Sequence, residues 1–376
     1  MPFRNERNIS MDIIFGQYGT ATVHATSLEE HAVSQIKMIL DNQISINSEV
    51  CIMPDCHPGK VGPIGLTMTV TDRVIPNLLG VDIGCGMLMA KVSCKHIEYQ
   101  KLDKVIREAI PSGFNIRKSA HNKVSADVLE PLFCRQHINE DKALRSIGTL
   151  GGGNHFIEVD KGSDGYYIVI HSGSRHLGME VTEYYNRLGR RDDTPYEMTY
   201  LVDDLMEQYL HDVKVVTSFA SLNRETILAE ILKGMKWKCE ETKESVHNYY
   251  GTLPGGGLIL RKGAASSRAG EFVIIPINMR DGVIIGEGKG SFFWNYSAPH
   301  GSGRKIKRTE VQNGYTVSAF KKNMKGIYST SISSDTLDEA PVAYRGIDEI
   351  MSLVGGTIKV KEVLKPVYNF KAGKER

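Results

Sequence analysis

Residues 80–87 read GVDIGCGM, and this short stretch is the starting point for the prediction of the fold. Glycines at positions 80, 84 and 86 predict a bent backbone, because glycine is unfavourable inside a regular helix or strand. The apolar run MLMAKV (87–92) follows at once and predicts a strand, so Asp82 and Cys85 stand just before a strand. From this stretch alone, Cys85 is either a small buried apolar residue or half of a metal site.

Working outward, short β-branched runs bounded by glycine or proline predict further strands along the whole chain, at 49–54, 64–70, 166–171 and 272–277. Helical spacing of apolar residues is clearest from about Thr199 to Leu232, and shorter helices are expected at 28–40 and 101–110. Segment 346–366 indicates a helix, a glycine break and a strand. Because strands and helices seldom alternate, the expected class is a mixed α+β fold of packed sheets. Neither the Rossmann spacing of glycines nor a P-loop motif is present.

Composition narrows the class of protein. The chain has 376 residues, 41% of them hydrophobic and 24% charged, with a net charge of only +2, so any polyanionic partner needs a local basic patch. Six cysteines are too sparse and irregular for a disulfide framework. The first ten residues lack an apolar signal region, and no run approaches eighteen unbroken apolar residues. We therefore expect a cytoplasmic enzyme with reduced thiols and no membrane partner.

Four histidines occupy positions that suit chemistry. His155 follows three glycines, His171 ends an apolar strand, His247 lies in SVHNYY, and His300 lies in APHGSGR. Each of them taken alone is more often a structural residue than a ligand. Together with the D-x-x-C turn they form a set of imidazole, thiolate and carboxylate groups that suits zinc, iron or manganese. Their long-range spacing matches no local metal motif, so spacing alone does not rank them.

Two short segments, HSGSR (171–175) and HGSGR (300–304), share a histidine, small residues and a final arginine. Free backbone N–H groups, hydroxyls and a guanidinium suit phosphate oxygens, although tight turns capped by arginine have the same pattern. Basic clusters at 303–308 and 321–325 favour phosphate binding. The residue pattern therefore indicates a metal-dependent enzyme that acts on phosphates.

Several longer blocks together resemble the RtcB family of RNA ligases, in the order in which the family has them. They are MPDCHPGKVGPIG (53–65), GVDIGCGM (80–87), GTLGGGNHFIE (148–158), HSGSR (171–175), HN (247–248), RKGA (261–264), PHGSGR (299–304) and DEAPVAYRGIDEI (338–350). The resemblance implies one domain over residues 1–376, with packed β-sheets flanked by helices around a central metal and GTP cleft.

The resemblance also implies an activity: joining an RNA 3′-phosphate or 2′,3′-cyclic phosphate to a 5′-hydroxyl, with GTP and two Mn²⁺ ions. The nucleophile that takes the guanylate maps to His300. Asp82, Cys85 and His155 map to one metal position, and Cys85, His171 and His247 map to the other, so that the Cys85 thiolate bridges both ions.

The remaining functional positions are carried over in the same way. Contacts to the guanylate map to Asn154, Glu158, Asn278, His300, Gly301, Ser302, Gly303 and Lys371. Arg175 and Arg304 match arginines expected to face RNA or pyrophosphate. The segment PINMRDGVII (276–285) departs from the family pattern, because Asn278 and Val283 replace serines and Arg280 replaces a glycine. The resemblance therefore leaves open whether guanylate binding is weaker or is rebuilt around Arg280.

Alternatives to an active repair ligase follow from these departures. One is a metal-dependent phosphodiesterase that opens cyclic RNA ends without sealing them. Another is a non-catalytic RNA-binding factor that works with a ribosome or a release-factor-like protein. The presence of all five mapped metal ligands and His300 favours an enzyme over a pure binding factor. The shorter length of the chain resembles the divergent family branch for which a release-factor-like partner is expected.

Overall fold

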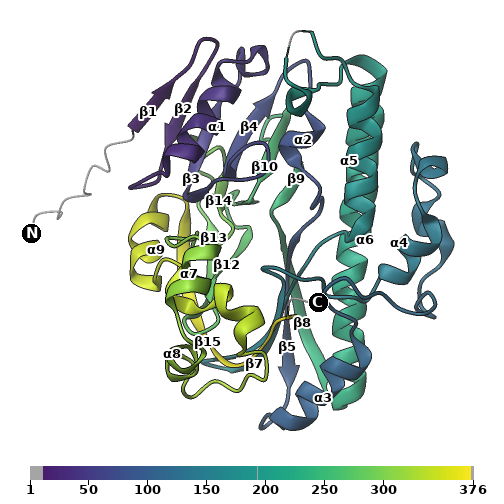
Figure 1. Cartoon of the computed structure of the whole chain (residues 1–376), viewed down its shortest axis with the longest axis vertical. Coiled ribbons are helices and arrows are strands. Elements are labelled where there is room, and N and C mark those ends of the chain that lie inside the picture. Colours follow the sequence, from purple (N-terminus) through teal and green to yellow (C-terminus); the bar gives the residue numbers. More distant parts are fainter. Residues whose placement is uncertain (1–11, 193, 374–376) are drawn as a thin grey trace, which may run out of the picture.

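The computed structural model describes residues 12–192 and 194–373. It has a mixed α+β architecture with two large sheets, as the sequence predicts. Figure 1 shows the N-terminal strands and helix on one side of the molecule, the long helices α5 and α6 on the other, and the C-terminal helices α7–α9 beside the sheets.

The first sheet has six strands in the order β1-β2-β3-β4-β10-β9. Their bounds are β1 Asp12–Phe15, β2 Thr20–Val23, β3 Val50–His57, β4 Ile64–Val70, β10 Leu258–Lys262 and β9 Asn248–Thr252. The second sheet has seven strands in the order β12-β13-β15-β6-β7-β5-β8. Their bounds are β12 Phe272–Asn278, β13 Gly282–Gly288, β15 Ile358–Phe370, β6 Phe156–Gly162, β7 Gly165–Ser172, β5 Gly86–Ser93 and β8 Lys238–Val246. A short ladder pairs β11 Ala264–Ser266 with β14 Ser297–Pro299.

The helices pack on these sheets and between them. Their bounds are α1 Glu30–Leu40, α2 Pro76–Leu79, α3 Tyr99–Ala109, α4 Glu140–Ser146, α5 His176–Leu188, α6 Asp203–Met235, α7 Arg308–Gly314, α8 Val317–Asn323 and α9 Ile347–Leu353. Helix α6 has 33 residues and contacts β5, β7, β9, α3 and α5 (Figure 1). Its buried face includes Tyr209, Val213 and Val216, on the stripe that the sequence indicated.

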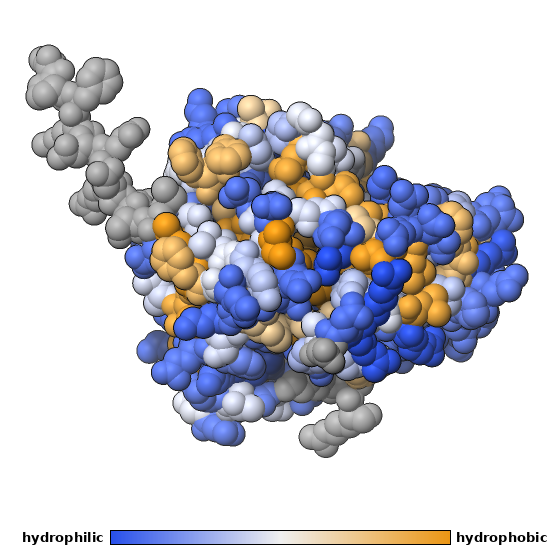
Figure 2. All heavy atoms as spheres, turned by 90° about the horizontal axis from the view of Figure 1, so that it is seen from above, coloured by the Kyte–Doolittle hydropathy of each residue, from blue (hydrophilic) through white to orange (hydrophobic). Residues whose placement is uncertain are grey.

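The start of α6 corrects the sequence prediction. The helix begins at Asp203 rather than Thr199, because the backbone of Tyr200 bonds to Arg190 and that of Leu201 bonds to Val74. Among the described helices, none is long and apolar enough to cross a membrane. In the face shown in Figure 2, hydrophobic side chains form separate patches among hydrophilic ones.

The register of the second sheet brings distant segments to one edge. Its strands β15, β6, β7, β5 and β8 are paired antiparallel, so the ends of β15, β7 and β8 lie beside the beginnings of β6 and β5. Phe370 pairs with Ile157, Phe156 with His171, and Gly86 with both Ser172 and Val246. The residues at or next to these strand ends therefore lie close together, at one end of the strands of the sheet: Cys85, His155, His171, His247 and Lys371.

Candidate active site: a shared-thiol metal cluster beside two cavities

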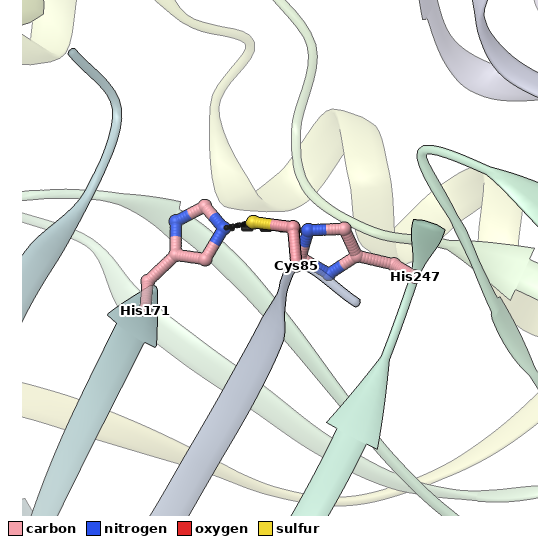
Figure 3. Close-up of side chains that lie close together, drawn as sticks. All are labelled: Cys85, His171 and His247. Atoms are coloured by element: carbon pink, nitrogen blue, oxygen red, sulfur yellow. Dashed lines mark hydrogen bonds between the residues drawn. The ribbon is translucent and has the colours of Figure 1, made fainter. Parts of the chain in front are cut away.

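Cys85 lies between two imidazole rings. Its Sγ is 3.1 Å from Nε2 of His171, and Nε2 of His171 is 3.3 Å from Nε2 of His247 (Figure 3). All three side chains are buried. The second ring nitrogen of His171, Nδ1, lies 3.2 Å from the carbonyl oxygen of Asn154. That contact fixes the tautomer with the proton on Nδ1 and leaves the Nε2 lone pair for a ligand.

Asp82 and His155 complete a second triad on the same thiol. Nε2 of His155 is 3.5 Å from Sγ of Cys85 and 3.6 Å from Oδ2 of Asp82. Within each triad the donor atoms all lie within 4.8 Å of one another. The structure thus brings together all five residues that the sequence analysis mapped to two metal positions, and Cys85 belongs to both sets.

A tight turn places Cys85 within this cluster. Gly84 has φ +73°, and a side chain there would meet α6 at 2.8 Å from Cα of Thr217, so glycine is required. The guanidinium of Arg224, fully buried on α6, donates to the carbonyl oxygens of Gly84 (2.8 Å) and Ser172 (2.6 Å). Arg224 therefore joins the turn to the end of β7, a positioning role that no motif in the sequence indicates.

The donor set fits a divalent cation. Burial lowers the pKa of His171 and of His247 well below the ordinary value, so both rings are neutral and able to coordinate. Burial, with the nearby Asp82 carboxylate, raises the pKa of the Cys85 thiol well above its ordinary value. A bound cation reverses that effect, because a coordinating thiol is deprotonated. The mixture of thiolate, imidazole and carboxylate suits manganese, iron or zinc.

His300 lies next to this cluster, directly after β14. Its ring centroid is 4.9 Å from that of His247, and its Nδ1 is 2.7 Å from Oδ2 of the fully buried Asp55. The same carboxylate oxygen accepts a hydrogen bond from the backbone N–H of Gly301 at 3.1 Å. Asp55 was not singled out from the sequence, although it lies in the block MPDCHPGK before a Gly/Pro-rich segment.

A cavity with an empty volume of about 800 Å³ opens beside His300. Predicted residues that line it are Asn154, Glu158, His171, Asn278, His300, Gly301, Ser302, Gly303, Arg304 and Lys371. It is also lined by polar residues that the sequence analysis did not assign, namely His57, Arg308, Glu339, Tyr344 and Asn369. Cys85 and His247 do not line it, since they lie deeper in its wall.

One side of this cavity is held by an ion-pair network. Nζ of Lys371 is 2.9 Å from Oε2 of Glu339, and Arg304 donates to the hydroxyl of Tyr344 at 3.0 Å. Arg308 also pairs with Glu339. Burial alone would raise the pKa of Glu339, but Lys371 and Arg308 lower it to about 2. The network therefore stays charged and holds the Lys371 amine at the cavity wall.

Strand β6, which pairs with the end of β15 just before Lys371, carries two adjacent buried carboxyl groups. Glu158 lines the cavity and accepts a hydrogen bond from Nδ2 of Asn369 at 2.5 Å. Asp160 follows two residues later on the same face of the strand and is also fully buried. Burial raises the pKa of Glu158 to about 7, and burial with Glu158 raises the pKa of Asp160 well above its ordinary value. Because adjacent buried carboxylates do not both ionise, Asp160 holds a proton beside Glu158.

The residues that depart from the family pattern, at 278–283, lie at the end of β12, in the turn that follows and at the start of β13. Asn278 lines the cavity, but its amide is engaged with the Asp281 side chain and with the backbone N–H groups of Arg280 and Asp281. Arg280 pairs with Asp281 and lies outside the cavity, and Val283 is buried in the core. The geometry thus gives Arg280 no part in binding at this cavity.

A second, larger cavity with an empty volume of about 1550 Å³ lies on the other side of the cluster. Asp82, His155 and Arg175 line it, and Asn154, Arg308 and Glu339 line both cavities. Arg175 donates to Oγ1 of Thr149 (3.0 Å) and to the carbonyl oxygen of Gly113 (2.6 Å). Members of the cluster therefore line both cavities: His171 faces the first, and His155 with Asp82 faces the second.

This geometry is that of a metal-dependent enzyme for phosphoryl or nucleotidyl transfer, and comparison with known proteins identifies the family. The family described as "tRNA-splicing ligase RtcB" matches residues 35–137 and 130–372, so the chain belongs to the RtcB family. It is 28% identical to the RNA-splicing ligase RtcB of Escherichia coli K12, covering 86% of this chain and 90% of the relative. It is also 28% identical to the RNA-splicing ligase RtcB2 of another E. coli strain, over 85% and 86% of the two chains. A more distant relative is the tRNA-splicing ligase RtcB of Nanoarchaeum equitans, at 24% identity over 91% and 90%.

Proposed function

We propose that this protein is an RNA ligase that uses GTP and Mn²⁺ to join an RNA 3′-phosphate or 2′,3′-cyclic phosphate to a 5′-hydroxyl. Membership of the RtcB family and the names of the relatives support RNA ligation. The observation that carries the proposal is the position of His300, which lines a cavity of polar and glycine residues, is oriented by Asp55, and lies beside the shared-thiol cluster.

In the first step His300 is the nucleophile. Since Nδ1 faces Asp55, Nε2 is the ring nitrogen that attacks the α-phosphorus of GTP. A phosphorus–nitrogen bond forms, the bond to the bridging oxygen breaks, and pyrophosphate leaves with that electron pair. Asp55 stabilises the cationic ring that results, in the way that a carboxylate orients a catalytic histidine.

Asp82, Cys85 and His155 would hold one divalent cation, and Cys85, His171 and His247 would hold the other. Bound there, the cations would neutralise charge on phosphate oxygens and help to orient the leaving group. The protein holds the ligands on strand ends of one rigid sheet, which keeps their geometry fixed.

The guanylate occupies the cavity beside His300. Lys371 and Glu158, from the neighbouring strand ends of β15 and β6, offer a donor and an acceptor for the base edge, and Asn154 and Asn278 also line the cavity. The loop of Gly301, Ser302 and Gly303 surrounds the phosphate, and Arg304 faces pyrophosphate or RNA.

The guanylate then passes to the RNA 3′-phosphate, and the 5′-hydroxyl displaces GMP to form the phosphodiester. RNA enters at the second cavity, where Arg175 lies. Residues 1–376 act as one ligase domain, because both sheets and α6 contribute to this single site. We further propose a cytoplasmic role in RNA repair, with a release-factor-like protein or the ribosome as partner.

The test is covalent guanylylation. The protein is incubated with labelled GTP and MnCl₂, and an acid-labile adduct is sought in the wild type, in His300→Ala and in the exposed-histidine control His96→Ala. We expect an adduct in the wild type and the control but none in His300→Ala. Hydrolysis of a 2′,3′-cyclic end without an adduct indicates a phosphodiesterase, and tight RNA binding with neither reaction indicates a binding factor.

A further inference from the structure

Phe114 is the most exposed large hydrophobic residue in the described part of the chain, with 80% of its surface accessible. Single exposed apolar side chains are ordinary on protein surfaces. Phe114 differs from them by its place, because it lines the second cavity together with the metal-cluster residues Asp82 and His155.

The backbone that carries this ring is held firmly. The N–H of Gly113 donates to the carbonyl oxygen of Gly151 at 3.0 Å, and the carbonyl oxygen of Gly113 accepts from Arg175 at 2.6 Å. The carbonyl oxygen of Pro111 accepts a hydrogen bond from the backbone N–H of Leu150 at 2.9 Å. The loop is therefore tied to the glycine-rich segment before His155, so Phe114 is an exposed ring on an ordered support.

Positive charge lies in the same cavity, because Arg175 also lines it and donates to Gly113, the residue before Phe114. The hydrogen bonds of Arg175 go to Thr149 and Gly113, which are neutral, and no described carboxylate forms an ion pair with its guanidinium. By contrast, Arg308, which also lines this cavity, is neutralised by Asp338 and Glu339. An aromatic face next to an arginine and a rigid loop is the combination that binds unpaired nucleotides.

We propose that Phe114 is a stacking platform for the base of an unpaired nucleotide next to the RNA end that enters the second cavity, with Arg175 beside the adjoining phosphate. This inference rests on the proposed ligase function and deepens it by assigning a residue that holds the RNA. Stacking on Phe114 positions the end at the cluster without reading its sequence, because every base has an aromatic face.

The test uses Phe114→Ala and Phe114→Trp, with Phe293→Ala as the matched control. Phe293 is a phenylalanine of similar exposure, 64%, that lines neither cavity. Affinity for labelled single-stranded RNA with a 3′-phosphate, and separately with a 5′-hydroxyl, is measured by fluorescence anisotropy. The KM for RNA in ligation and the rate of guanylylation by GTP are measured in parallel.

We expect Phe114→Ala to weaken RNA binding and raise the KM for RNA by about tenfold, within the range for loss of one stacked base. Guanylylation stays at the wild-type rate, and Phe114→Trp and Phe293→Ala keep full RNA affinity. An abasic nucleotide placed near one end weakens binding to the wild type by a similar factor but causes no further loss with Phe114→Ala. The RNA for which the abasic nucleotide weakens binding to the wild type only, whether the one with the 3′-phosphate or the one with the 5′-hydroxyl, is the RNA that enters the cavity.

Wild-type RNA affinity in Phe114→Ala, or an equal abasic penalty in both proteins, overturns the stacking proposal. A wild-type protein that forms no guanylate adduct and seals no RNA overturns the ligase function instead. RNA affinity is measured without turnover, so the stacking proposal is tested in either case.

Discussion

Nδ1 of His300 lies 2.7 Å from Oδ2 of Asp55, and Asp55 has no solvent-exposed surface. The same carboxylate oxygen also accepts the N–H of Gly301, so one buried acid positions both the ring and the loop that follows it. The proposed nucleophile is therefore oriented by a residue of the first sheet, while the cluster residues Cys85, His155 and His171 lie at strand ends of the second sheet.

Asp55→Asn is expected to slow guanylylation by about 10²–10⁴-fold, because the amide cannot stabilise the cationic ring and favours the wrong tautomer. The rate of adduct formation with labelled GTP measures this effect. The metal content should stay at the wild-type level, since Asp55 belongs to neither triad. A near-normal rate in Asp55→Asn would show that His300 is oriented by other contacts.

Cys85→Ala is expected to remove both bound ions and abolish ligation, because the thiol belongs to both triads. Metal analysis of protein equilibrated with Mn²⁺ measures the stoichiometry, and Cys239→Ala, at an exposed cysteine, is the control. If Cys85→Ala keeps one ion per chain, the thiolate does not bridge.

Gly173→Ala separates the two metal positions. A methyl group at residue 173 would lie 2.2 Å from Oδ1 of Asp82, so the carboxylate has to move. We expect loss of the ion held by Asp82, Cys85 and His155, with the other ion retained. Gly152→Ala, where the nearest atom is 3.6 Å away, is the matched control. Equal metal content in both variants would argue against Asp82 as a ligand.

Arg224→Met is expected to destabilise the fold by about 1–3 kcal/mol, since it leaves the carbonyl oxygens of Gly84 and Ser172 without their buried donor. Urea unfolding gives the loss of stability, and metal analysis of the folded fraction shows whether the Cys85 turn is also misplaced. Arg187→Met, on the last turn of α5, is the control. Unchanged stability would mean that the turn is held by its other contacts.

Asp160→Asn is expected to stabilise the protein at pH 8 by about 1–3 kcal/mol and to have little effect below pH 4. The folded state raises the pKa of Asp160 well above 3.8, so it binds more protons than the unfolded state above that pH. The stabilising contribution of Asp160 is thus complete below about pH 3.8 and is lost as pH rises, a loss that the amide avoids. Unfolding at pH 4 and pH 8 measures the difference, and a pH-independent effect would show that Asp160 is ionised in the fold.

Much of the fold was predictable from local pattern. The five strands predicted from short apolar runs are confirmed, as is the strand predicted within 346–366, and the segment 64–70 agrees at both ends with β4. Strand β8 escaped notice because its sequence KCEETKESV is largely polar and most of it is exposed, so alternation of hydrophobicity does not mark it. The long helix begins later than predicted because Tyr200 and Leu201 form β-bridges with Arg190 and Val74. These are tertiary contacts, which the helical spacing of apolar residues cannot predict.

The candidate site was harder to predict from sequence pattern than the fold. The convergence of Cys85, His155, His171 and His247 depends on the antiparallel register of four strands, which the spacing of the residues does not specify. Resemblance to the family supplied that set, but not Asp55 or Arg224. Both act through a partner residue, so their importance is visible only from the contacts in the folded chain.

The position of β15 has a consequence for how the protein is made. This strand is near the C-terminal end of the described chain, yet it lies in the middle of the second sheet, between β13 and β6. The hairpin β12–β13 is therefore synthesised before its neighbour β15, and Lys371 follows β15. A nascent chain can bring the residues of the thiol cluster together, but it completes the cavity beside His300 only after residue 371 has been added. Premature termination before residue 358 thus divides the sheet at its centre and yields no partially active ligase.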